Sequence, residues 1–254
     1  MGGRLPDAWR LSVGTLTAIP VRPPTRVDRD TAGLAMVLAP IAVVPLGLLV
    51  TLVLWGGREL GLNPLAYGLL GVGALALGSR AFHLDGLADT ADALTSSYDR
   101  ERSLEVMKSG AAGPAGVAAL VVVLGVQSVA LAVLVSSGAG IAMAGVLVCF
   151  SRLALTITCA RGVPAARPDG LGAATAHSVP RPIAVASWSA AAAVSAAMVE
   201  YTGGTWWHVV MGFAVAAGVV ALLVVRAVRR LGGVTGDIYG AAIEISLAAL
   251  LLSA

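Results

Sequence analysis

Charged side chains are scarce in this sequence of 254 residues: they make up 12% of it, whereas hydrophobic residues make up 57%. A soluble domain carries about 25% charged residues, so this composition excludes an ordinary soluble protein and indicates an integral membrane protein. Cysteine is scarce as well. Cys149 and Cys159 lie ten residues apart in one apolar segment, which excludes a disulfide between them, and two thiols alone make no metal site.

Seven uncharged or nearly uncharged segments are candidates for membrane-spanning helices. They cover residues 33–55, 64–82, 111–135, 139–159, 182–201, 206–225 and 240–252. About 20 apolar residues cross a bilayer, so the last segment is marginal. We expect an all-α, polytopic integral membrane helical bundle of about seven transmembrane helices, in which the whole chain, 1–254, forms a single membrane-embedded domain.

The basic residues predict the orientation of this bundle. With a cytoplasmic N-terminus, sixteen of the seventeen Lys and Arg residues lie on the cytoplasmic side and Arg58 lies outside, as the positive-inside tendency predicts. Twelve of the fourteen acidic residues lie on the same side, so we expect the working surface to be cytoplasmic. The N-terminal segment 1–30 contains a short apolar piece, 11–21, that resembles an interfacial helix. The net charge of +3 gives no reason to invoke nucleic acid.

The stretch 82–92 concentrates carboxylates beside the second apolar segment. On an α-helix, Asp85, Asp89 and Asp92 fall within an arc of about 60°. Like charges this close repel one another, so a positive group must compensate them. Mg²⁺ prefers oxygen ligands and is often held by one or two carboxylates together with substrate phosphates, so the pattern predicts a Mg²⁺ site serving phosphoryl transfer. A solvated acidic helix end is the plain alternative, and His83 is a candidate base or supporting residue.

Basic residues on the cytoplasmic side are candidates for holding a phosphorylated substrate. Lys108 precedes a glycine-rich turn at 113–116, whose backbone N–H groups are suited to a phosphate at a helix start; packing is the alternative reason for these glycines. Arg161 and Arg167 follow the fourth apolar segment. They suit a phosphate clamp, and positive-inside anchoring explains them almost as well.

A second acidic motif follows the sixth apolar segment. The glycine-rich run 232–237 contains Thr235 and ends in Asp237, and Glu244 lies seven residues later on the same helix face. This patch is suited to hold a second metal or to orient a hydroxyl nucleophile; a re-entrant turn that needs glycine is the alternative. Arg152 lies inside the fourth apolar segment, where an unpaired charge is costly, so we expect a carboxylate partner such as Glu244 or one of the aspartates.

Together these motifs resemble the cobalamin synthase family, the adenosylcobinamide-GDP ribazoletransferases, which are membrane enzymes that close the nucleotide loop of vitamin B12. The family's acidic signature is similar to the run HLDGLADTAD at 83–92, although Ala93 stands where the family commonly has glycine. The run 232–244 resembles its second signature, 161–172 its middle loop and 11–21 its N-terminal piece. The resemblance therefore spans nearly the whole chain.

One region departs from the family pattern. Many members carry Met-Lys-Asp-Ser after the acidic helix, whereas here Lys108 is followed by Ser109 and Gly110. If that aspartate binds metal in relatives, this chain manages without it.

The resemblance implies a phosphoryl transfer in which α-ribazole, or its 5′-phosphate, attacks adenosylcobinamide-GDP and expels GMP. It implies Mg²⁺ as cofactor, with Asp85, Asp89 and Asp92 as its ligands and Asp92 or Asp237 as the proton acceptor. We expect substrate binding by His83, Lys108, Arg152, Arg161, Arg167, Thr235 and Glu244. The implied location is the bacterial cytoplasmic membrane, with a cytoplasmic active face; a homo-oligomer or a complex with other cobalamin-assembly enzymes is left open.

Two other classes of protein compete with this interpretation. A CDP-alcohol phosphotransferase also uses an aspartate-rich membrane helix, but its pattern has Ala-Arg where this chain has Asp89 and Thr90. A cation-coupled transporter places such residues near the middle of the bilayer on broken helices. Nearly all the acidic residues here gather at one face, which favours phosphoryl transfer.

Overall fold

The computed structural model describes residues 3–254, and every regular element in that range is helical, so the expected all-α membrane bundle is confirmed. The elements are α1 (Arg4–Leu16), α2 (Arg29–Ala42), α3 (Val44–Glu59), α4 (Pro64–Gly78), α5 (Phe82–Ser96), α6 (Arg100–Val106), α7 (Pro114–Leu134), α8 (Gly138–Phe150), the 3-10 helix η1 (Ser151–Leu153), α9 (Ala154–Thr158), α10 (Gly170–Thr175), α11 (Arg181–Tyr201), α12 (Trp206–Leu231) and α13 (Gly236–Leu251).

Several helix starts are set by local hydrogen bonds that the sequence encodes. The side chains of Asp28, Asn63, Asp99, Ser137 and Thr235 each accept a hydrogen bond from a backbone N–H in the first turn of the helix that follows. These side chains satisfy donors that a helix leaves unpaired at its N-terminus. The boundaries of α2, α4, α6, α8 and α13 are therefore local properties of the chain.

Within residues 3–254, five helical segments are long and apolar enough to cross a membrane: Arg29–Glu59, Pro114–Leu134, Gly138–Thr158, Arg181–Tyr201 and Trp206–Leu231. The number rises to six if α4 and α5 together count as one bent span, against the seven expected. The two predicted spans that are too short to count by themselves correspond to α4 and α13, which have 15 and 16 residues. At 1.5 Å per residue each is about 22–24 Å long, shorter than a hydrocarbon core of about 30 Å.

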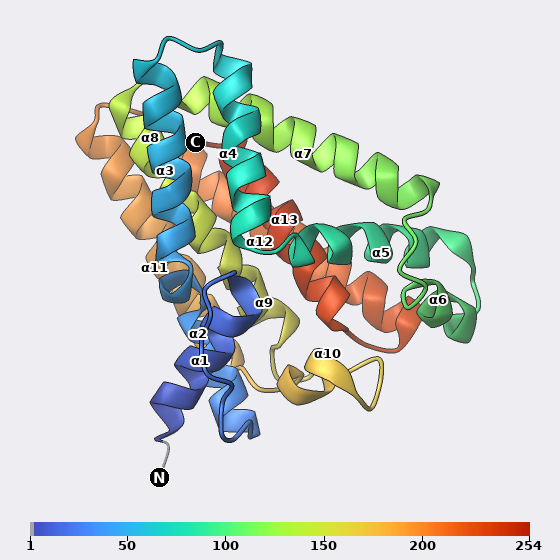
Figure 1. Ribbon diagram of the computed structural model, residues 1–254. Coiled ribbons are helices and arrows are strands. Elements are labelled where there is room, and N and C mark those ends of the chain that lie inside the picture. Colours follow the sequence, from blue (N-terminus) through green and yellow to red (C-terminus); the bar gives the residue numbers. More distant parts are fainter. Residues whose placement is uncertain (1–2) are drawn as a thin grey trace.

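The chain turns sharply after α4, and this turn creates the acidic helix. Arg80 and Ala81 have φ values of 57° and 56°, in the left-handed region that non-glycine residues rarely adopt. As a result α5 lies at 94° to α4, and Figure 1 shows it running across the direction of α3 and α4. The predicted span 64–82 is therefore wrong beyond Gly78. The turn contains Ser79 and Arg80, but Ala81 and Phe82 follow them, so a single charge within a mostly apolar segment did not reveal it.

The N-terminal part of the chain differs in its boundaries from the prediction. The predicted interfacial helix at 11–21 is instead α1, from Arg4 to Leu16, and it exposes Leu5 and Trp9. Exposed apolar side chains beside arginines suit a helix that lies at a membrane surface. The predicted span 33–55 is two helices, α2 and α3, which meet at Val43.

The ends of the bundle differ in character. The connection between α3 and α4 lies at one end, and α10 and the start of α1 lie towards the other (Figure 1). The segments joining α5 to α7, α9 to α11 and α12 to α13 meet through long-range hydrogen bonds. Arg100 donates from Nε to the carbonyl of Leu231 and from Nη2 to the carbonyl of Ala166, each at 2.8 Å. These three connecting segments, which carry basic residues predicted to lie on the cytoplasmic side, are thus parts of one surface.

Candidate active site

The site is built where α5 crosses α13 at very short range. A Cβ atom added at Gly86 would lie 2.7 Å from the carbonyl oxygen of Asp237, and one at Gly240 would lie 2.9 Å from the Cα of His83. Side chains larger than hydrogen do not fit at such distances, so two glycines permit the crossing. The crossing brings the first turn of α13, with Asp237, against the acidic helix.

Three carboxylates meet at this crossing. Asp85 is exposed, and together with Asp237 it lines a cavity between α5 and α13. Asp89 is buried on α5, which is not one of the five spanning segments. Burial, together with the like charges of Asp85 and Asp237, raises the pKa of Asp89 to about 6. In the described range no Lys or Arg pairs directly with these carboxylates. The patch therefore carries negative charge that a cation would stabilise.

Thr235 prepares the first turn of α13 for this role. Its hydroxyl accepts a hydrogen bond from the backbone N–H of Ile238, and it lies 3.1 Å from Oδ2 of Asp237. The same residue therefore caps the helix and orients the carboxylate. The sequence placed Thr235 among the substrate-binding residues; the structure puts it next to Asp237.

Asp92 has partners that the sequence did not indicate. Its two carboxylate oxygens accept hydrogen bonds from the backbone N–H groups of Gly113, at 2.6 Å, and Gly116, at 2.9 Å. These N–H groups belong to the start of α7, so Asp92 fills the anion position at that helix terminus. The predicted phosphate cradle at 113–116 is therefore wrong, because a side chain of the protein already occupies it.

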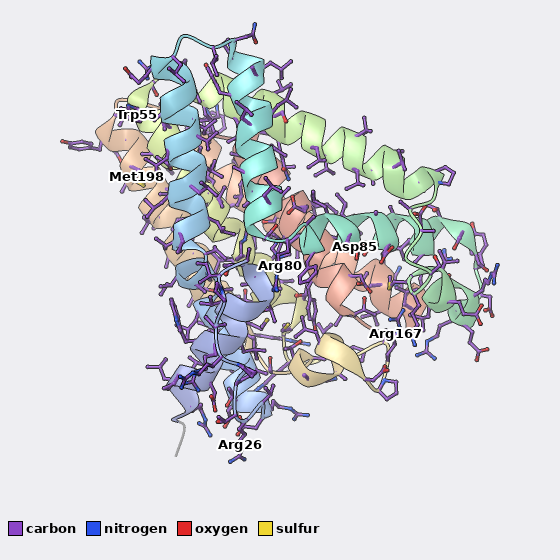
Figure 2. The ribbon with its side chains drawn as sticks, viewed as in Figure 1. Arg26, Trp55, Arg80, Asp85, Arg167 and Met198 are labelled. Carbon is purple, nitrogen blue, oxygen red and sulfur yellow. The ribbon has the colours of Figure 1, made fainter. Side chains whose placement is uncertain are left out.

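The predicted basic residues separate into two groups. Arg167 donates from Nη2 to the carbonyl of Leu104 at 2.8 Å, and its charge acts on Asp89 and Asp237. In Figure 2, Arg167 and Asp85 both lie on the side of the molecule formed by α5, α10 and the start of α13. Lys108 and Arg161 are exposed in the loops around this region, and nothing in the described structure ties their side chains to the carboxylates.

A buried polar group lies behind the cavity. Arg152 is fully buried and donates from Nη1 to the carbonyl of Val148 and to Oγ of Ser151, each at 2.8 Å. Among the described residues no ion pair within 4.0 Å joins it to Glu244 or to an aspartate. The expected direct pair is therefore wrong, although the two charges interact through the interior.

Glu244 is held by a residue that the sequence analysis did not single out. The side-chain amide of Gln127, on α7, donates to Oε2 of Glu244 at 2.8 Å and to its carbonyl oxygen at 3.1 Å. Oε1 of Glu244 lies 3.8 Å from Nδ1 of His83. The signal was present: a glutamine inside an apolar span is costly unless it has a partner.

Two further contributors also escaped the sequence analysis. Arg100 joins the three loops, as described above, and the hydroxyl of Thr175 donates a hydrogen bond of 3.0 Å to the hydroxyl of Tyr239, which links α10 to α13. Neither contact has a signature in residue spacing. Both depend on loops that approach one another only in the folded chain.

No group of three or more His, Cys, Asp or Glu side chains within residues 3–254 is arranged to hold a metal ion by itself. The predicted set of Asp85, Asp89 and Asp92 is therefore not a preformed three-carboxylate site, and Asp92 is engaged elsewhere. Asp85 and Asp89, with Asp237 opposite, do fit the commoner arrangement for Mg²⁺. In that arrangement one or two carboxylates and several waters hold the ion, and substrate phosphates complete the shell.

Comparison with known proteins identifies relatives along nearly the whole chain. The family described as cobalamin-5-phosphate synthase matches residues 8–254. A protein named adenosylcobinamide-GDP ribazoletransferase from a Nocardioides species is 58% identical over 247 residues, which are 97% of each chain. Proteins of the same name from Frankia casuarinae and Pseudomonas putida are 38% and 36% identical, covering 96% and 91% of this chain and 92% and 91% of their own.

No solved structure matches this chain significantly. The sequence relatives, however, cover the α5 and α13 motifs, both of which fall inside the matched range. A match of this extent shows common descent with these proteins. The chain therefore belongs to the cobalamin-5-phosphate synthase family.

Proposed function

We propose that this protein is an adenosylcobinamide-GDP ribazoletransferase. The 3′-hydroxyl oxygen of α-ribazole, or of its 5′-phosphate, forms a bond to the cobinamide-side phosphorus of the pyrophosphate. The bond from that phosphorus to the bridging oxygen breaks, and GMP leaves with this oxygen. The products are adenosylcobalamin, or its 5′-phosphate, and GMP.

The observation that carries the proposal is the crossing of α5 and α13, which sets Asp237 against the acidic helix. Phosphoryl transfer asks a protein mainly to position two substrates and to compensate charge. Clustered carboxylates beside a cavity, with the charge of Arg167 acting on them, support this chemistry. The family of the chain supplies the identity of the substrates.

Asp85 and Asp89 are the residues that would hold Mg²⁺. Burial and neighbouring carboxylates raise the pKa of Asp89, a sign of negative charge that the protein leaves uncompensated. When bound, Mg²⁺ supplies the positive charge that a pyrophosphate and a leaving GMP require. Asp92 is not among these ligands in our proposal, because it caps α7.

Asp237 is the candidate acceptor for the proton of the attacking hydroxyl. It lines the cavity beside Asp85, and the hydroxyl of Thr235 orients its carboxylate. Arg167 lies close enough for its charge to act on Asp89 and Asp237, and a guanidinium suits phosphate oxygens. Arg167 therefore binds the phosphates of the donor at the outer side of the site.

The proposed location is the bacterial cytoplasmic membrane, with the site on the cytoplasmic side. The segments that carry Arg100, Arg167 and Arg230 lie together around the site, and clustered basic residues mark the cytoplasmic side of a membrane protein. Both proposed substrates are nucleotide derivatives, which a cytoplasmic site meets directly.

A product assay with purified protein tests the proposal. Protein in detergent or vesicles is supplied with adenosylcobinamide-GDP, α-ribazole and Mg²⁺, and adenosylcobalamin and GMP are measured by chromatography. We expect product from the wild type, none with EDTA, and a loss of at least about 10²-fold in Asp89→Asn. Glu101→Gln, which changes an exposed acid on α6, is the matched control and keeps full activity.

Two results would contradict the proposal. A folded wild type that makes no product with either α-ribazole or its 5′-phosphate would favour a CDP-alcohol-type phosphotransferase instead. An Asp89→Asn protein with normal, Mg²⁺-dependent turnover would remove Asp89 from the site.

A further inference from the structure

A cavity of about 340 Å³ opens beside Asp85 and Asp237. Its walls come from α1, α2, α5, α9, α10 and α13, and most of them are apolar, including Met36, Leu155 and Leu171. The volume is within the range of small-molecule sites, which are largely apolar with a few polar groups. The cavity is therefore suited to a flat, mostly apolar group whose polar end reaches the two carboxylates.

His83 is the polar residue of this cavity that has no explained role. Its side chain is buried, with 4% of the residue exposed, and both ring nitrogens are without a hydrogen-bond partner. Glu244 lies 3.8 Å from Nδ1 and is itself held by Gln127. Each of these nitrogens has less than 1 Å² of accessible surface, so a ligand in the cavity does not reach them, and Asp85 and Asp237 are the charged side chains that it meets.

Resting on the function proposed above, we propose that this cavity binds the acceptor nucleoside, with its benzimidazole against the apolar walls and its ribose towards the two carboxylates. In this position the ribose lies next to Asp85 and Asp237, where the attacking hydroxyl is needed.

The guanine and the corrin of the donor substrate do not fit this cavity. Guanine, on the donor, carries several ring and exocyclic donors and acceptors, and apolar walls would leave most of them unpaired at a cost. A benzimidazole nucleoside has one free ring nitrogen and no ring N–H. The corrin with its side chains is several times larger than the cavity, so the cobinamide part of the donor stays outside.

Filling the cavity tests this assignment. Leu171 is half-buried on the short helix α10, so Leu171→Trp places an indole in the cavity with little disturbance of the core. The matched control is Leu134→Trp: Leu134 is also half-buried but lines a different cavity, of about 450 Å³, between the ends of α7 and α11.

Two readouts separate this inference from the proposed function. Binding of α-ribazole alone is followed by its benzimidazole fluorescence, without donor or turnover, and KM is measured for each substrate. We expect Leu171→Trp to weaken α-ribazole binding by about tenfold or more, as loss of about 1.4 kcal/mol implies. In Leu171→Trp the KM for adenosylcobinamide-GDP stays within about twofold of the wild-type value. In Leu134→Trp both α-ribazole binding and this KM stay within about twofold, which is less than the change expected for a lost contact.

Three outcomes would overturn the assignment while leaving the reaction intact. One is an active Leu171→Trp protein with unchanged α-ribazole binding. Another is a rise in the KM of the donor alone, which would place the guanine or corrin in the cavity. The third is displacement of α-ribazole by guanosine. Failure of the proposed function is distinct, because the wild type would then yield no product whatever the binding assay reports.

Discussion

The close crossing of α5 and α13 makes a sharp prediction about Gly86. In Gly86→Ala the new methyl carbon would lie 2.7 Å from the carbonyl oxygen of Asp237, an atom of the backbone that cannot rotate away. Restoring ordinary contact requires the helices to separate by about 0.7 Å. Because Asp237 and the acidic helix lie on opposite sides of this contact, the separation widens the site directly.

The expected size of the effect follows from two sources. Overpacking of a close contact costs about 1–3 kcal/mol of the free energy of unfolding, partly offset by the helix preference of alanine over glycine, about 1 kcal/mol. A displacement of about 1 Å in a site that depends on positioning costs about 10²-fold in rate. We therefore expect Gly86→Ala to remain folded and to lose about tenfold to 10²-fold in kcat.

The assay pairs product formation with thermal unfolding in detergent. Gly73→Ala is the matched control: Gly73 lies on the exposed face of α4, and a Cβ there meets nothing within 4 Å. It should unfold at the same temperature or higher and keep wild-type kcat. A stable Gly86→Ala protein that turns over at the wild-type rate would refute the reasoning, since the glycine contact would then not position Asp237.

Three further outcomes follow from the site. Asp92→Ala removes the acceptor for two N–H groups at the start of α7, so it should lower the free energy of unfolding by about 1–2 kcal/mol, measured by chemical or thermal unfolding without Mg²⁺; unchanged stability would contradict the capping role. Because the pKa of Asp89 is raised to about 6, the proton competes with Mg²⁺ below that pH, and the half-saturating Mg²⁺ concentration should rise up to about tenfold per pH unit. The same shift means that metal-free protein gains stability as pH falls from 7 through 6, because the folded state then binds more protons than the unfolded state; thermal unfolding should show this gain, and Asp89→Asn should reduce it.

Composition and hydropathy predicted the class of this protein because the bilayer imposes requirements that are visible locally. Four of the predicted spans correspond to α7, to the segment formed by α8, η1 and α9, to α11 and to α12 within a few residues. Capping side chains such as Ser137, before α8, and Thr235, before α13, mark helix starts in the same local way. The predicted boundaries failed where the chain bends within an apolar run, at Val43 and at Arg80-Ala81. Apolarity does not change at Val43, and at the second bend Arg80 is a single charge between apolar residues.

The candidate site was predicted in part for a similar reason. The periodicity of Asp85, Asp89 and Asp92 placed them on one helix, and the helix is real. Which partner each carboxylate has was not encoded in that spacing. Asp92 turns to the N-terminus of α7, whereas Asp89 remains near Asp237, more than a hundred residues further along the chain.

Short-range physics thus decided the membrane class, most helices and the acidic face of α5, because hydropathy, capping and a repeat of 3.6 residues all act between neighbours in sequence. Folding decided the depth of the α5–α13 contact, the capping of α7 by Asp92 and the cavity around His83. Each of these depends on segments from distant parts of the chain. Their separation is set by the packing of whole helices, and a packed interior leaves room for one arrangement only.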